Sequence, residues 1–294
     1  METKWWSITA VAPVVWGANY LVIAHLLPPG SPLWGAALRA TPAAVLLLLW
    51  CRSLPHGHWW WRSTVLGVLN VSAFFLCIHL AGENLPSSVA ASVMALSPVV
   101  LGGFAWWLLA QRPSRTWFGA VLLGATGVVA MLGPSISGLS VLGLAASASA
   151  LVMFGLGGVL SRRWVDEQPL LHVTAWQLAL GSLTLLPVAA AVEGAPPRLD
   201  AAGVLGVGLS SVVATALAYL CWFGGLRRLP AGSVGVVGLL NPVTGLALGV
   251  LLAGERLGPV QALGVCGVLG AVALAARPGT RTLRRCEGSD CSAG

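Results

Sequence analysis

Long apolar stretches without charge follow one another along nearly the whole chain, separated by short segments rich in arginine, proline or glycine. A helix that spans a bilayer needs about 20 predominantly apolar residues, and continuous rather than alternating hydrophobicity favours helices over barrel strands. Two stretches exceed one span, and proline–glycine clusters at 28–32 and 133–135 divide them. The pattern predicts an all-α membrane protein with ten transmembrane helices, at residues 7–26, 33–50, 64–82, 88–109, 116–133, 139–160, 170–192, 201–222, 231–253 and 258–276.

The composition excludes several other classes of protein. Only 9% of the 294 residues are charged, whereas 57% are hydrophobic. A soluble domain has roughly a quarter of its residues charged, and disordered chains have low hydrophobicity. We therefore interpret the net charge of +7 as an adaptation to the lipid bilayer, and we expect no nucleic-acid partner.

The distribution of lysine and arginine predicts the orientation in the membrane. With the amino terminus inside, the loops on that side and the tail carry 13 of these residues, and the opposite loops carry only Arg198 and Arg256. Basic residues concentrate in cytoplasmic loops. The count predicts a multi-pass protein of the cell membrane with both termini in the cytoplasm.

An internal repeat divides the chain into two halves. At a constant offset of 144 residues, Leu85-Pro86 matches Leu229-Pro230, Ser97-Pro98 matches Asn241-Pro242, and Gln111-Arg112 matches Glu255-Arg256. At an offset of 138, Trp16-Gly17 matches Phe154-Gly155 and Arg39 matches Gln177. We expect a five-helix repeat at 7–133, a second at 139–276 and a basic cytoplasmic tail at 277–294. Because five is odd, the second repeat would be inverted, an arrangement typical of secondary transporters with a binding site between the halves.

The same residues carry a family resemblance. The segments Trp16-Gly17-Ala18-Asn19-Tyr20 and Leu38-Arg39-Ala40, together with the repeated Leu-Pro, Pro and Glu-Arg pattern, resemble EamA-type permeases of the drug/metabolite transporter superfamily. The resemblance covers residues 7–276. It implies a ten-helix basket of two repeats that works by alternating access without a nucleotide. One position departs from the family pattern, because Gln111 stands where the first repeat usually has an acid, and this puts a charge pair with Arg112 in doubt.

Polar residues inside the spans are the candidates for substrate binding. Trp16, Asn19 and Tyr20 share one face of the first helix, and an asparagine facing lipid would leave its amide unsatisfied. That face is expected to point at a cavity in the bundle, although interhelical hydrogen bonding and aromatic packing would also explain it. Tyr219 is a further candidate, with hydrogen bonding between helices as the alternative.

Arg39 is the one charged residue within a predicted span. Placing an arginine at mid-depth costs about 3 kcal/mol on insertion scales. Two interpretations remain open at this point. The side chain either binds an anionic group of the substrate or locks a gate, or it snorkels to the outer membrane surface.

Two matching polar-proline pairs lie in the middle of predicted spans. Proline frees a backbone carbonyl one turn earlier, so Ser97-Pro98 and Asn241-Pro242 predict kinks. Ser97 and Asn241 become candidate substrate contacts, and Pro98 and Pro242 candidate hinges for gating; a purely structural kink is the alternative. Lone polar residues elsewhere in the spans, namely Asn70, Ser72, Gln177 and Thr215, are interpreted as interhelical hydrogen-bonding groups. Glycines at 245 and 249 and at 264, 267 and 270 predict close helix packing.

The chain lacks the sequence motifs of several enzyme classes. It contains no G-x-x-x-x-G-K-[ST], H-E-x-x-H or G-x-S-x-G, and its single lysine is Lys4. We expect no catalytic residue, no cofactor and no metal. The predicted function is a secondary active exporter of small metabolites, amino-acid-like or amphipathic and drug-like, that works by alternating access. A polytopic membrane enzyme or scaffold without transport activity is the alternative. The sequence leaves the coupling ion and a homodimeric state open.

Overall fold

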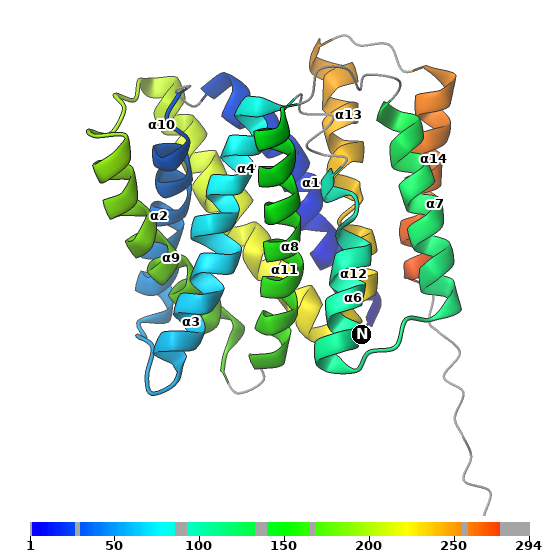
Figure 1. The fold of residues 1–294 in the computed structure, drawn as a ribbon, viewed down its shortest axis with the longest axis horizontal. Coiled ribbons are helices and arrows are strands. Elements are labelled where there is room, and N and C mark those ends of the chain that lie inside the picture. Colours follow the sequence, from blue (N-terminus) through cyan, green and yellow to red (C-terminus); the bar gives the residue numbers. More distant parts are fainter. Residues whose placement is uncertain are drawn as a thin grey trace, which may run out of the picture.

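The computed structural model describes residues 2–26, 30–85, 93–132, 140–164, 168–253 and 258–276, and the elements in these ranges are helices (Figure 1). In the first half they are α1 (Glu2–Leu26), α2 (Pro32–Cys51), α3 (Trp59–Gly67), η1 (Val68–Ser72), α4 (Ala73–Asn84), α6 (Ser97–Leu109) and α7 (Arg115–Leu132). In the second half they are α8 (Val141–Trp164), α9 (Leu170–Val192), α10 (Ala201–Gly208), η3 (Leu209–Leu217), α11 (Ala218–Arg228), α12 (Ala231–Val237), α13 (Leu240–Ala253) and α14 (Pro259–Ala275).

Two predicted spans are interrupted in the middle. A turn at residues 238–239 separates α12 from α13, and a turn at 95–96 precedes α6. Pro98 and Pro242 therefore lie in the first turn of a new helix, where the missing N–H of proline costs no helical hydrogen bond. The prediction of proline kinks within continuous helices was wrong, because the chain breaks the helix before each proline.

Two other spans continue through π-helical turns. The element η1 joins α3 to α4, and η3 joins α10 to α11. In each turn a hydroxyl bonds the carbonyl five residues earlier, from Ser72 to Gly67 at 3.3 Å and from Thr215 to Ser210 at 2.8 Å. Short π-helical segments within α-helices are frequent at functional sites.

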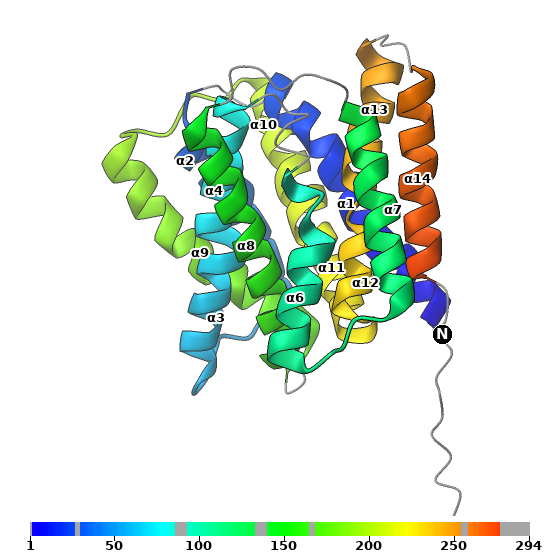
Figure 2. The same cartoon turned by 45° about the vertical axis from the view of Figure 1, so that its right-hand side comes forward.

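The described helices form an upright bundle with two distinct ends (Figures 1 and 2). At one end the side chain of Arg227 donates to the carbonyl of Gln168 at 2.5 Å, which joins the end of α11 to the start of α9. At the other end the carboxylate of Glu193 accepts from the backbone N–H groups of Leu33 and Trp34 at 2.8 and 2.9 Å. The carboxylate thus satisfies free N–H groups at the start of α2.

The outer surface of the bundle is apolar. Leu122, Leu251 and Leu263 are 68%, 76% and 72% exposed, and many other large aliphatic and aromatic side chains also face outward. Within the described residues, six helical stretches are long and apolar enough to cross a membrane, and three shorter apolar helices accompany them. The fold is consistent with the predicted multi-pass membrane protein.

Helices α7 and α14 lie side by side along their length (Figure 2). Gly127 and Gly264 make this close approach possible, because a Cβ atom on Gly264 would lie 2.5 Å from the carbonyl oxygen of Gly127. The prediction of close packing is thus confirmed at Gly264. At Gly245 it was wrong, because a Cβ atom there would meet nothing within 4 Å.

Candidate functional site

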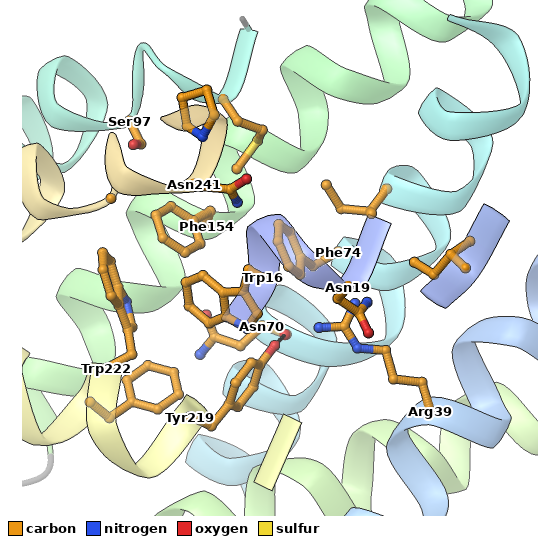
Figure 3. A pocket seen from close by; sticks show the side chains of 17 residues that line it. Trp16, Asn19, Arg39, Asn70, Phe74, Ser97, Phe154, Tyr219, Trp222 and Asn241 are labelled. Carbon is orange, nitrogen blue, oxygen red and sulfur yellow. Dashed lines mark hydrogen bonds between the residues drawn. The ribbon is translucent and has the colours of Figure 1, made fainter. Parts of the chain in front are cut away.

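A cavity lies between helices of the two halves of the chain (Figure 3). Most of the residues predicted as site residues line it: Trp16, Asn19, Arg39, Ser97, Tyr219, Asn241 and Pro242. Pro98 instead packs against the backbone of α12, where a Cβ atom on Gly235 would lie 2.7 Å from its Cα. Tyr20 belongs to α1, but its side chain lies outside the described residues.

Arg39 on α2 is 5% exposed and crosses from the first half to the second. Its Nε donates to the Thr215 hydroxyl at 2.9 Å, and its Nη2 donates to the Ala214 carbonyl at 3.2 Å. The guanidinium also lies over the Phe75 ring, 4.2 Å from the centroid. The snorkelling alternative was therefore wrong, because the side chain is held inside the bundle by η3.

Two residues of α1 also bond to η3. The indole N–H of Trp16 donates to the carbonyl of Ala214 at 2.9 Å, the same oxygen that Arg39 contacts. The side-chain oxygen of Asn19 accepts from the Ser210 hydroxyl at 2.8 Å. Trp16 and Asn19 therefore bond to a neighbouring helix and also line the cavity.

The turn η1 makes similar contacts with helices of the second half. The Asn70 amide donates to Gln177 at 2.9 Å and to Ser161 at 3.2 Å. The Tyr219 hydroxyl donates to the carbonyl of Asn70. Asn70 was interpreted only as an interhelical group, yet it lines the cavity as well. The arrangement ties α8, α9 and α11 to η1.

Aromatic rings form much of the cavity wall (Figure 3). Trp16 lies edge-on to Phe154 at 6.1 Å between centroids and tilted against Trp222 at 5.3 Å. Phe74 stacks on Phe154 at 5.9 Å. Sequence reasoning missed Phe74, Phe154 and Trp222 as site residues. The internal repeat could have indicated Phe154 as a site residue, because Phe154 matches Trp16 at the offset of 138 residues.

The charge of the lining limits the chemistry of the cavity. Among the described lining residues, Arg39 carries the single charge, and amides of Asn19, Asn70 and Asn241 supply further polar groups. The described lining contains neither a carboxylate nor a histidine. The arrangement is suited to binding, with apolar rings for a planar group and a cation for an acceptor or anion.

A bundle of apolar helices around a mixed polar and aromatic cavity defines a polytopic membrane protein with a candidate site between its halves. A family model described as the EamA-like transporter family matches residues 3–133 and again residues 141–277. The chain belongs to this family of transporters. The resemblance noted in the sequence is thereby confirmed.

The chain is also similar to individual proteins. It is 34% identical to the protein PecM of Dickeya dadantii, over 89% of this chain and 88% of that protein. It is 26% identical to a probable amino-acid metabolite efflux pump of Salmonella typhimurium, over 90% of this chain and 92% of the pump. A solved crystal structure with 20% identity shares the fold with a TM-score of 0.78, over 93% of this chain and 96% of that one.

Proposed function

We propose that this protein is a secondary transporter of the cell membrane that exports small metabolites by alternating access. The observation that carries the proposal is the cavity, because it lies between the two segments that the family model matches separately. A binding site near the middle of the bundle, between two related halves, is the arrangement that alternating access requires. The efflux pump among the relatives supports export as the direction.

The proposed architecture is ten transmembrane helices in two inverted five-helix repeats, with both termini in the cytoplasm. Family matches to both halves support the duplication. The concentration of arginines at the end of the bundle where Arg227 meets Gln168 supports the orientation. The breaks before Pro98 and Pro242 place a non-helical turn beside the cavity in each half, and we assign these turns the role of hinges.

The proposed substrate is a small planar or aromatic compound that bears a carboxylate or another strong acceptor. The rings of Trp16, Phe154 and Trp222 would contact its apolar part, and Arg39 would face its acceptor group. A cationic compound of the same shape would be repelled, since the described lining holds a positive charge and no carboxylate.

The test is a flux assay in proteoliposomes with three probes of one shape: 3-phenylpropionate as anion, L-phenylalanine as zwitterion and phenethylamine as cation. We expect protein-dependent flux of the anion or zwitterion and none of the cation above that of empty liposomes. A growth-rescue screen across amino acids and toxic analogues then widens the search. Absence of any protein-dependent flux, together with turnover of a compound in detergent, would favour the membrane-enzyme alternative.

A further inference from the structure

A second pocket, an open cleft, lies at the arginine-rich end of the bundle, away from the cavity described above. It is a cleft between the loop that precedes α7, the end of α11, the start of α12 and the end of α14. Arg112 and Arg228 lie in its lining, and the described lining contains no carboxylate. Serine and threonine hydroxyls at positions 114, 116 and 233 add further hydrogen-bonding groups.

Among the described lining residues, no carboxylate balances the positive charge of Arg112 and Arg228. Gln111 stands beside Arg112, whereas the matching position of the second half is Glu255. The Gln111 side chain accepts from the backbone N–H of Ala231 at 3.3 Å and so contacts the start of α12. The amide oxygen of Gln111 accepts this hydrogen bond without adding a negative charge to the cleft. The guanidinium of Arg228 lies over the ring of Trp5 at 5.0 Å, which leaves its charge in place.

Exposed aromatic side chains lie on two of the helices that line the cleft, α6 and α7. Trp106 and Trp107 on α6 are 58% and 76% exposed, and the same helix contributes Gly102 and Ala105 to the lining. Phe118 on α7 is 59% exposed, next to the lining residue Trp117. Tryptophan is enriched where membrane proteins meet the interface between lipid and water. A soluble phosphate ester would use the arginines but would gain nothing from the exposed aromatic side chains of α6 and α7.

We propose that the cleft binds the head group of an anionic phospholipid of the cytoplasmic leaflet, with the acyl chains lying along α6 and α7. Basic pockets between transmembrane helices on the cytoplasmic side are suited to such head groups. The inference goes beyond substrate transport and does not depend on it. The ligand is a structural or regulatory lipid, and its phosphate contacts Arg112 and Arg228.

Native mass spectrometry of the purified full-length protein tests the proposal, with phosphatidylglycerol as the probe and phosphatidylcholine as the neutral reference. Each arginine near a membrane surface strengthens anionic-lipid binding about fivefold, so the double variant Arg112→Gln/Arg228→Gln should bind phosphatidylglycerol about 25-fold more weakly. Binding of phosphatidylcholine should not change. The variant Arg112→Lys/Arg228→Lys keeps the charge and should retain most of the affinity.

The matched control is Arg52→Gln/Arg163→Gln, which removes two exposed arginines outside the cleft lining. We expect less than a twofold loss for this control. An equal loss in both double variants would mean diffuse surface charge and would overturn the site. Equal affinity for water-soluble glycerol phosphate would mean a free phosphate-ester site and would overturn the lipid assignment. Should the double variant not remain monodisperse, the single variant Arg112→Gln decides the matter by its expected fivefold loss.

Discussion

Replacing Arg39 separates a role in binding from a role in folding. The substitution Arg39→Met removes the charge and keeps much of the apolar length. It deletes the hydrogen bonds to Thr215 and Ala214 and the contact with the Phe75 ring. If Arg39 binds the acceptor group of the substrate, transport should be lost while the protein stays folded.

The energies of the interactions that Arg39 makes indicate that the variant Arg39→Met stays folded. Two interhelical hydrogen bonds in a membrane contribute about 1–3 kcal/mol together, and a desolvated cation–π contact contributes about 2 kcal/mol. Inserting an arginine into the bilayer costs about 3 kcal/mol. These terms nearly cancel, so Arg39→Met should change the free energy of unfolding by at most about 2 kcal/mol. A hydrogen bond from a charged group to the substrate contributes about 1.5–3 kcal/mol, which is roughly a 10- to 150-fold change in affinity.

The assay compares binding and flux of 3-phenylpropionate with those of the neutral 3-phenylpropanol in the same proteoliposomes. Arg39→Met should weaken binding of the anion by roughly 10- to 150-fold and leave binding of the alcohol nearly unchanged. Arg39→Lys keeps a charge but not the planar fork of donors, so we expect an intermediate effect. Undiminished transport of the anion would remove Arg39 from the mechanism. An equal loss of binding and flux for both probes would show that the role of Arg39 is structural.

Three further predictions concern the bundle itself. A double-mutant cycle of Asn70→Ala and Gln177→Ala should give a coupling energy of about 0.5–2 kcal/mol in unfolding measurements; a value near zero would contradict the observed hydrogen bond. Gly264→Ala forces a Cβ atom to within 2.5 Å of the Gly127 carbonyl and should lower the free energy of unfolding by about 1–3 kcal/mol. Gly245→Ala, which meets nothing within 4 Å, is its control and should be nearly neutral. A reporter fused after residue 137 should lie outside the cell while both termini are cytoplasmic, and a cytoplasmic reporter would refute the inverted repeat.

Much of the cavity could be predicted from the sequence because the bilayer leaves polar side chains few alternatives. A side chain such as Asn19 or Arg39 must find partners inside the bundle, and both line the cavity. The partner of Arg39 could not be predicted, because one of its acceptors is the backbone carbonyl of Ala214. Every residue has a backbone carbonyl, so the residue pattern does not show which carbonyl accepts a hydrogen bond.

The breaks and wide turns were also beyond the sequence. A change from α-helical to π-helical turns, as in η1 and η3, leaves the length and the apolar character of a predicted span unchanged. Pro98 and Pro242 indicated an irregularity, but proline is compatible both with a kink and with a new helix start. The choice depends on the neighbouring helix, since Pro98 packs against Gly235.

The two π-helical segments receive matching contacts from the two halves of the chain. Arg39 on α2 bonds to η3 of the second half, and its match Gln177 on α9 bonds to Asn70 in η1 of the first half. Each half therefore extends a polar side chain from its second helix into the wide turn of the other. The pair is unequal in charge, because arginine donates to η3 and glutamine accepts from η1. If the halves exchange conformations as proposed, the positive charge stays on one side of the cavity throughout the cycle, and an anionic group of the substrate keeps its partner in both states.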